Sequence, residues 1–269
     1  MKIHPTAVIH PKAVLADDVE VGAYSVLGEH VTIGAGTRVL SHVSIDGWTD
    51  IGQRCELHPF VSVGGPPQHM QYKGEPTKVV IGNDNILREY VTVNRATVQG
   101  GGVTTVGHSN FLMAYVHVAH DCHLGNHLIL ANAASLAGHI SIGDHAIIGG
   151  LSGIHQFVRI GAYAMVGGCC ALGQDLPPFM RAAGGYRARM YGLNSIGLRR
   201  HGFSADRIAT LKKAYEMLFR SGHRVAEAVK LARETFGASQ DVMQVADFMQ
   251  GTKRGICRSV GKDQEGEEE

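Results

Sequence analysis

The sequence predicts an all-β solenoid, a parallel β-helix of hexapeptide repeats, followed by a C-terminal α-helical domain. Aliphatic residues stand at every sixth position from Ile3 to Val63, and the same phase returns from Ile81 to Val93. After a shift of one residue, the period resumes at Val106 and runs unbroken to Leu172. A small or branched residue follows four positions after most of these aliphatic residues. A hexapeptide period of this kind is typical of a parallel β-helix.

Each hexad is expected to form one short strand and one bend. The aliphatic residue and the residue four positions later face inward, as at Ile51 and Cys55. Glycine, which often follows the aliphatic residue, or Asn/Asp is expected at the bend, because a positive φ costs glycine little. Three strands close a coil of about 18 residues around a stack of side chains.

The β-helix is expected over residues 1–182, interrupted by two loops. Residues 64–78 replace hexads without changing the phase, so this loop should project from one corner of the coil. Residues 99–105 break the phase by one residue, which predicts a second and smaller excursion. Long loops on a rigid scaffold are common places for functional sites.

A helical domain is expected over residues 183–258, beyond the end of the hexads at Pro177 and Pro178. Ser204 is the N-cap candidate for a helix with apolar residues at helical spacing. The apolar positions of this helix are Ile208, Leu211, Tyr215, Leu218 and Phe219. Residues 259–269 are expected to form an acidic, disordered tail.

Composition narrows the function classes. The net charge is +1, but residues 187–233 hold 11 Lys and Arg against 3 Asp and Glu, which suits a solvated helix face or an anionic partner. Aromatic residues are sparse there and no nucleic-acid motif occurs, so no nucleic acid is expected. We find no signal-peptide pattern and no apolar run of membrane length, so a cytoplasmic protein with no membrane insertion is expected. The five cysteines lack zinc spacing and suggest reduced thiols.

Histidine is unusually frequent, with 16 residues in the chain. The hexads that begin at Val118, Leu136 and Ile154 are one coil apart, so they should stack about 4.8 Å from one another. This stack carries His120, Asp121, Gly138, His139, His155 and Gln156, with His117 at the preceding bend. An imidazole paired with a carboxylate is a general base poised near neutral pH, and a glycine N–H can stabilise an oxyanion. Other histidines at bends, such as His145, are explained by the fact that bends are exposed and tolerate polar residues.

A zinc site is the alternative interpretation of the histidines. His117, His120 and His123 resemble the clusters of β-helical carbonic anhydrases, which bind Zn²⁺ through three histidines from two subunits. His117 and His120 occupy different hexad positions, however, and His123 is expected at a bend that points elsewhere. We therefore expect no metal.

Several segments match a known enzyme family: VHVAHDCHLGN, LANAASLAGHISIGDHAIIGG, IHQFVRIG, VGGCCALGQDLPP and GEPTKVVIG. They resemble the acyl-carrier-protein-dependent UDP-N-acetylglucosamine O-acyltransferases, the first enzymes of lipid A biosynthesis. The resemblance covers the β-helix, the 64–78 loop and the helical end through GLNSIGLRRHGF. It implies a left-handed coil and a homotrimer whose substrate cleft lies between subunits.

The resemblance also implies roles for individual residues. His120 corresponds to the catalytic base, Asp121 to the group that holds its tautomer, and the Gly138 amide to the oxyanion donor. Gly168 matches the position that limits acyl length, where glycine leaves the groove open for a longer 3-hydroxyacyl chain. Substrate-binding positions of the family correspond to Gln68, His69, Gln71, His117, His139, His155 and Gln156, and its nucleotide-contacting positions to Asn194 and Arg200.

The implied reaction moves a 3-hydroxyacyl chain from acyl carrier protein to the sugar 3-position of UDP-N-acetylglucosamine. His120 takes the proton of the attacking 3-hydroxyl, and the acyl donor is the phosphopantetheine-bound carrier, so no further cofactor is expected. The basic segment 187–233 is then a candidate docking surface for the acidic carrier protein.

Four positions depart from the family pattern. His69 stands where aspartate is common, Gln71 where lysine is common, Ile196 replaces a glutamate and His201 replaces an arginine. Without a carboxylate near the sugar C3, an amine there is less strongly held as an ammonium. A 3-amino-3-deoxy sugar nucleotide, giving an amide product, is therefore an alternative acceptor. Alternatives of another class are a β-helical carbonic anhydrase, a coenzyme-A-dependent acetyltransferase and a non-catalytic solenoid.

Overall fold

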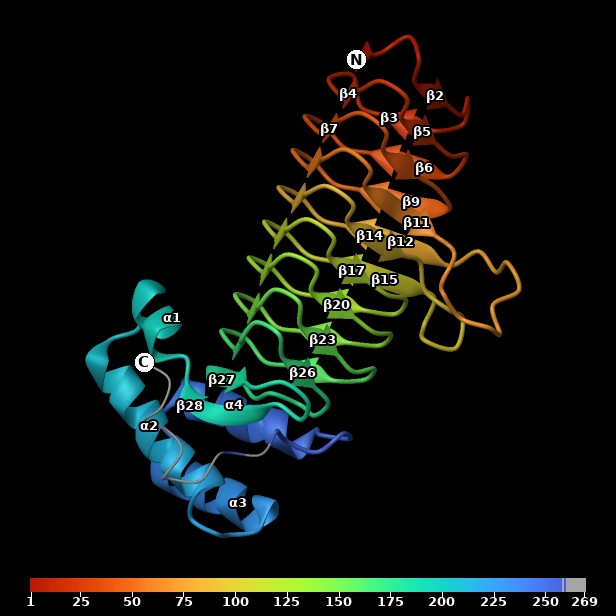
Figure 1. The fold of residues 1–269 in the computed structure, drawn as a ribbon. Coiled ribbons are helices and arrows are strands. Elements are labelled where there is room, and N and C mark those ends of the chain that lie inside the picture. Colours follow the sequence, from red (N-terminus) through yellow and green to blue (C-terminus); the bar gives the residue numbers. More distant parts are fainter. Residues whose placement is uncertain (258, 260–269) are drawn as a thin grey trace.

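A computed structural model describes residues 1–257 and 259. The chain winds into a left-handed parallel β-helix with a group of helices packed below its last coils (Figure 1). The fold class expected from the hexapeptide period is thus confirmed. No helix within the described residues has the length and apolar character needed to span a bilayer.

Three sheets form the walls of a triangular prism. Sheet A has the strand order β1 (Lys2–Ile3), β4 (Glu20–Val21), β7 (Arg38–Val39), β10 (Glu56–Leu57), β13 (Ile86–Leu87), β16 (Phe111–Leu112), β19 (Ile129–Leu130), β22 (Ile147–Ile148), β25 (Met165–Val166), β27 (Met180–Ala183) and β28 (Arg189–Leu193). Its strands are parallel except for the last pair, β27 and β28, which is antiparallel.

Sheets B and C are parallel throughout. Sheet B has the order β2 (Val8–Ile9), β5 (Val26–Leu27), β8 (Ser44–Ile45), β11 (Ser62–Gly65), β14 (Thr92–Asn94), β17 (His117–Val118), β20 (Ser135–Leu136), β23 (Gly153–Ile154) and β26 (Ala171–Leu172). Sheet C has the order β3 (Val14–Leu15), β6 (Val31–Ile33), β9 (Trp48–Ile51), β12 (Lys78–Ile81), β15 (Val103–Val106), β18 (His123–Leu124), β21 (Ser141–Ile142) and β24 (Arg159–Ile160).

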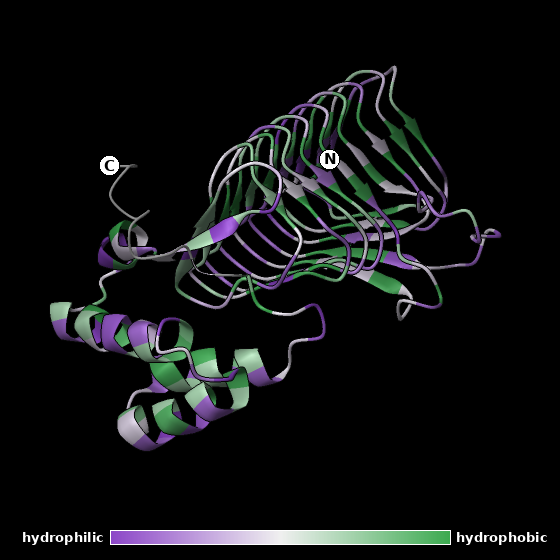
Figure 2. Ribbon diagram, turned by 60° about the horizontal axis from the view of Figure 1, so that its bottom comes forward, coloured by the Kyte–Doolittle hydropathy of each residue, from purple (hydrophilic) through white to green (hydrophobic). Residues whose placement is uncertain are grey.

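The core is the stack of inward aliphatic side chains that the period predicts. Along sheet B, for example, Val118 pairs in register with Leu136 and Leu136 with Ile154, and all three side chains are buried. Apolar residues accordingly recur on successive coils in Figure 2. The inward residue four positions later is buried as well, and where it is polar it bonds to the backbone. Thr37 Oγ1, for instance, donates to the Gly52 carbonyl of the next coil at 2.8 Å.

The glycines that follow the aliphatic residues serve a purpose other than the one expected. Gly52 does not adopt a positive φ; Arg54, two residues later, does, at 52°. A Cβ on Gly52 would lie 2.6 Å from the Gly82 carbonyl carbon, so glycine is required there by the close approach of neighbouring coils. The expectation of glycine, Asn or Asp at the corners holds for Gly36, Asp84 and Asp121, but it was wrong at most corners, where tyrosine, histidine, phenylalanine and other residues adopt a positive φ.

Both predicted loops leave the same corner, where the chain passes from sheet B to sheet C; we call it the BC corner. The longer loop connects β11 to β12, and the shorter one connects β14 to β15 on the next coil (Figure 1). The shorter excursion covers residues 95–102 rather than 99–105, because β15 already begins at Val103. His120 and Asp121 follow at this corner one coil further on, between β17 and β18.

The C-terminal region contains α1 (Ser195–Arg200), α2 (Ala205–Phe219), α3 (Val225–Phe236) and α4 (Gln240–Gln250). The Ser204 side chain caps α2 by accepting from the Arg207 N–H, as expected. The first helix begins at Ser195, so the start of the expected helical domain is the β27–β28 hairpin. The segment after α4 returns to the β-helix, where Ile256 pairs with the buried Asp175. The expected acidic tail, residues 259–269, lies outside the described residues except for Ser259, which pairs with Met190.

Candidate active site

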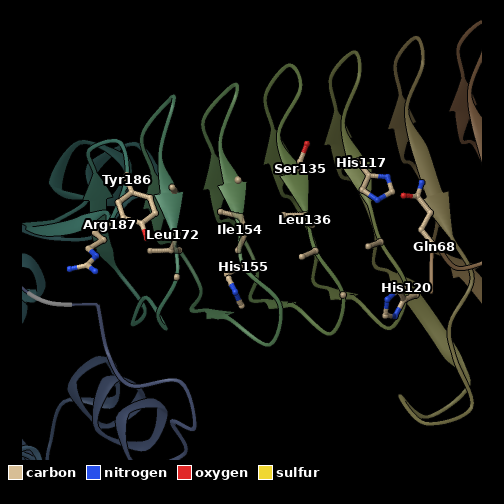
Figure 3. A pocket seen from close by; sticks show the side chains of 16 residues that line it. Gln68, His117, His120, Ser135, Leu136, Ile154, His155, Leu172, Tyr186 and Arg187 are labelled. Atoms are coloured by element: carbon tan, nitrogen blue, oxygen red, sulfur yellow. The ribbon is translucent and has the colours of Figure 1, made fainter. Parts of the chain in front are cut away.

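A groove of about 690 Å³ runs along the outer face of sheet B beside the BC corner. Gln68, His117 and His120 lie at one end, and Tyr186 and Arg187 lie at the other (Figure 3). The groove therefore extends from the two long loops toward the last coils of the β-helix.

The groove floor comes from outward positions on successive strands of sheet B. In register, His117 pairs with Ser135, Ser135 with Gly153 and Gly153 with Ala171. The side chains thus become small beyond the imidazole, which leaves open space over the following coils. A groove lined by small and apolar groups, with polar groups gathered at one end, suits an extended apolar chain that carries a reactive polar head.

At the polar end, His120 and Asp121 form a hydrogen-bonded dyad. Nδ1 of His120 lies 2.7 Å from Oδ2 of Asp121, and Asp121 is only 1% exposed. The carboxylate can only accept, so the ring proton lies on Nδ1 and Nε2 is left free as a base. Asp121 adopts a positive φ of 61°, a conformation that aspartate tolerates better than most residues.

Gly138 lies one coil below His120 and contacts the flat side of its ring. A Cβ at Gly138 would come within 2.6 Å of His120 Cε1, so the imidazole occupies the space that any side chain would take. Among the described residues, the Gly138 N–H has no hydrogen-bond partner. The arrangement therefore offers a base and an uncommitted backbone donor on adjacent coils.

Other histidines surround the dyad. The His139 ring lies edge-on to His120 with centroids 5.1 Å apart, and its Nε2 lies 3.7 Å from Asp121 Oδ2. Burial lowers the pKa of His139, although Asp121 partly opposes this effect. Burial also lowers the pKa of His117, whose Nδ1 lies 2.7 Å from Thr92 Oγ1. Both rings are therefore neutral at neutral pH.

His69 reaches His120 from the long loop. The two rings are edge-on with centroids 5.2 Å apart, and Nδ1 of His69 is buried without a hydrogen-bond partner within the described part of the chain. Gln68 from the same loop lines the groove, whereas Gln71 is exposed and does not.

The predicted stack of three imidazoles is only partly formed. His120 and His139 touch, but His155 lies further along the groove, because its strand register matches Ala119 and Ala137 rather than His120. Gln156 is exposed and does not line the groove.

The geometry also bears on the zinc alternative. His117 and His123 were expected at bends, but they lie in strands β17 and β18, which belong to different sheets. Among the described residues, the group with ligand atoms within 4.8 Å of one another is instead His120, Asp121 and His139. The short contact inside that group is the hydrogen bond of the dyad.

Besides Gln71 and Gln156, three further predicted site residues lie away from the groove of their own chain. Gly168 lies between β25 and β26, at the corner from sheet A to sheet B. Asn194 is the N-cap of α1, where it accepts from the Gly197 N–H and donates to the Tyr163 carbonyl. Arg200 is exposed at the end of the same helix. Their roles stay predictions.

Sequence reasoning missed the residues that support the dyad and the long loop. Thr97 donates to the Asp121 carboxylate, and Thr104 Oγ1 accepts the Asp121 N–H at 2.8 Å. Arg95 donates to the Gly64 carbonyl at 2.8 Å and to Tyr72 Oη at 3.0 Å, which ties the long loop to the coil. The phase break after Thr97 was the one sequence feature that marked this segment.

Comparison with known proteins gives a consistent result. Residues 175–257 match the family model described as "Udp N-acetylglucosamine O-acyltransferase; Domain 2", and residues 1–35 match that of the bacterial transferase hexapeptide. The acyl-[acyl-carrier-protein]–UDP-N-acetylglucosamine O-acyltransferase of Thermodesulfovibrio yellowstonii is 53% identical over 257 residues, covering 96% of this chain and 99% of that protein. The same-named protein of Halorhodospira halophila is 50% identical, with the same coverage of both chains.

Solved structures agree. The structure of LpxA from Acinetobacter baumannii superposes with a TM-score of 0.92 at 44% identity, covering 95% of this chain and 99% of that one. The UDP-N-acetylglucosamine acyltransferase from Campylobacter jejuni gives a TM-score of 0.91 at 40% identity, covering 96% and 100%. Because sequence and fold agree over nearly the full length, the chain belongs to the acyl-[acyl-carrier-protein]–UDP-N-acetylglucosamine O-acyltransferase family.

Proposed function

We propose that this enzyme transfers a 3-hydroxyacyl chain from acyl carrier protein to the sugar 3-position of UDP-N-acetylglucosamine, the first step of lipid A biosynthesis. The observation that carries the proposal is the His120–Asp121 dyad beside Gly138, at the polar end of a groove with a small-residue floor. The enzymes to which the chain is similar carry this acyltransferase name.

In this mechanism, Nε2 of His120 removes the proton of the sugar 3-hydroxyl as its oxygen attacks the thioester carbonyl. The Gly138 N–H stabilises the oxyanion of the tetrahedral intermediate. The intermediate collapses, the carbon–sulfur bond breaks, and the imidazolium returns its proton to the leaving thiolate. Asp121 holds the ring in the tautomer that leaves Nε2 free and stabilises the transient imidazolium. The carrier-bound thioester supplies the acyl group, so the reaction needs no further cofactor.

The side chain at position 69 bears on whether the acceptor is the 3-hydroxyl or the 3-amino sugar nucleotide. Its imidazole, rather than a carboxylate, lies edge-on to His120. An anion at this place would hold a 3-amino group as ammonium, which cannot attack a thioester; an imidazole does so less strongly. The 3-amino-3-deoxy sugar nucleotide is therefore the second candidate acceptor.

Purified protein incubated with 3-hydroxyacyl carrier protein and either sugar nucleotide tests both proposals. Mass spectrometry should show an acylated sugar nucleotide with wild type and none with His120→Ala. Comparison of kcat/KM for the hydroxyl and amino sugars, in wild type and His69→Asp, identifies the acceptor. Absence of transfer to either sugar by well-folded wild type would reject the acyltransferase proposal. Amide formation that is negligible in wild type and unaltered by His69→Asp would reject the amino acceptor alone.

We also propose that the enzyme works as a homotrimer, in which a neighbouring chain completes the groove. Rings stack along the corner from sheet A to sheet B, with neighbouring centroids 4.8 to 5.2 Å apart, in the order Tyr24, His42, Phe60, Tyr90 and Tyr115. The end members, Tyr24 and Tyr115, are 61% and 60% exposed. An exposed aromatic row of this length is typical of a subunit contact.

Gly168 lies at that same corner, so a neighbouring chain could bring its acyl-length position to the groove. Light scattering should give three times the chain mass of 28.8 kDa. The double variant Tyr90→Lys/Tyr115→Lys should give a smaller particle with little activity. A monomeric wild type with full activity would reject the trimer.

Acyl carrier protein is the proposed macromolecular partner. Exposed basic residues of the C-terminal region include Arg187 at the groove end, Arg199, Lys212, Lys213 and Arg224. Such a surface attracts an acidic protein and speeds its association, an effect that salt weakens. We further propose a cytoplasmic location, which the five unpaired cysteines support.

A further inference from the structure

We propose that Thr97 is the positioning residue of the catalytic dyad: it holds the Asp121 carboxylate, and through it the His120 ring, in the reactive orientation. The inference rests on the proposed acyltransferase function and adds a third member to its catalytic unit. Thr97 belongs to the short excursion, residues 95–102, and lies 24 positions before Asp121 in the chain.

Thr97 engages both carboxylate oxygens. Its backbone N–H donates to Asp121 Oδ1 at 2.9 Å, and its hydroxyl donates to Oδ2 at 2.8 Å. Oδ2 is also the atom that accepts from His120 Nδ1. Because Thr97 donates one hydrogen bond to each carboxylate oxygen, the carboxylate plane cannot rotate without breaking one of these two bonds. The direction of Oδ2 toward the imidazole is fixed as a result.

The Thr97 hydroxyl is itself held in one orientation. Oγ1 accepts the Gly100 N–H at 3.1 Å, so its own proton is directed to Asp121. Thr97 is 2% exposed and Asp121 is 1% exposed, so water does not compete for these bonds. Hydrogen bonds to a charged, buried acceptor are the stronger ones in proteins.

The excursion is closed tightly over the carboxylate. A Cβ on Gly100 would lie 2.0 Å from the Asp121 side-chain carboxyl carbon, so no side chain fits between the loop and the dyad. The backbone of Asp121 is also held, because its N–H donates to Thr104 Oγ1. Titratable groups near the dyad include His69 from the long loop, His117 from β17, Cys122 next to Asp121 and His139 from the next coil. None of these groups makes the hydrogen bond to Asp121 Oδ2 that the Thr97 hydroxyl makes; His139 Nε2, for example, lies 3.7 Å from that oxygen.

Steady-state kinetics of three variants test the proposal. Thr97→Val removes the hydroxyl with little change in shape and keeps the backbone N–H. We expect kcat to fall about 10- to 100-fold, with KM for each substrate within about twofold of wild type. Thr97→Ser restores the donor and should recover most of kcat. Thr37→Val removes a similarly buried hydroxyl, bonded to Gly52 O, from a distant coil and should leave kcat unchanged.

A double-mutant cycle separates positioning from a general structural role. If Thr97 acts through the carboxylate, Thr97→Val should cause no further loss of kcat in an Asp121→Ala background. Additive losses, a change in KM alone, or failure of Thr97→Ser to recover kcat would each overturn the inference.

A readout without turnover distinguishes this failure from failure of the proposed function. The downfield proton signal of the His120 Nδ1–H, followed by NMR, should shift in Thr97→Val and return in Thr97→Ser. If wild type transfers no acyl group while this signal responds, the proposed function fails and the positioning contact stands. If wild type is active and neither kcat nor the signal responds to Thr97→Val, the inference fails alone.

Discussion

A Cβ added at Gly138 would lie only 2.6 Å from Cε1 of His120, so the position of the imidazole on one coil requires a glycine on the next. The sequence shows both residues, one coil apart, but the contact itself depends on which way the His120 ring turns. Asp121 and Thr97 set that direction.

Gly138→Ala should therefore displace the His120 ring and lower kcat about 100-fold, since a misplacement near 1 Å is enough for such a loss. Gly185→Ala is the matched control, because an added Cβ there meets nothing within 4 Å and Gly185 lies outside the groove lining. Initial rates at saturating substrates measure the effect. Wild-type kcat in a folded Gly138→Ala protein would contradict the assigned contact.

Arg95→Met should loosen the long loop, which places Gln68 in the groove lining and His69 against His120. The guanidinium bonds to the Gly64 carbonyl and to Tyr72 Oη are lost, so substrate binding must order the loop. We expect KM for the sugar nucleotide to rise about tenfold, a loss of roughly 1.4 kcal/mol in binding. Arg54→Met, which removes an exposed ion pair with Asp84, should leave KM unchanged. An unaltered KM in Arg95→Met would show that the loop needs no such anchor.

Substitution of two neighbouring residues on β20 should change the free energy of unfolding by very different amounts. Leu136 faces the core and is 0% exposed, whereas Ser135 faces outward into the groove. Leu136→Ala should lower the free energy of unfolding by about 2–5 kcal/mol. Ser135→Ala should change it by less than about 0.5 kcal/mol. Urea unfolding followed by circular dichroism checks both, and equal losses would mean that the inward face is misassigned.

Acid should destabilise the protein through His145. Its ring stacks between His127 and Tyr163, and burial lowers its pKa, as do the neighbouring His127 and His201, against an opposing effect of Asp144. A lowered folded-state pKa means that the unfolded chain binds more protons below about pH 6.5, so stability falls as pH falls through that range.

Thermal unfolding midpoints at about pH 7.5 and pH 5.5 test this coupling. The difference between the two pH values should be smaller in His145→Asn than in wild type. An equal difference in both proteins would assign the acid sensitivity to other groups.

Much of the site could be predicted because a regular coil converts sequence separation into position. The hexapeptide period placed His120, Asp121 and Gly138 at one corner, and the hydrogen bond of the dyad is present as expected. The same count failed for His155, which stands one position earlier in its hexad than His120 does, so its side chain lies elsewhere in the groove. The glycines that follow the aliphatic residues were expected at bends with a positive φ. They are instead required by close contact between coils, which a turn preference does not predict.

The sequence by itself determined the β-helix, its inward face and the pairing of a histidine with a carboxylate, because these follow from a constant repeat and from adjacency in the chain. Only the tertiary structure decided that Thr97 donates to Asp121, that the His69 ring lies edge-on to His120 and that Arg95 ties the long loop to the coil. These residues lie in loops or at a break in the repeat, where no period relates sequence number to position. Their contacts depend on how the excursions fold back on the coil, which is set by side-chain packing and hydrogen bonding in three dimensions.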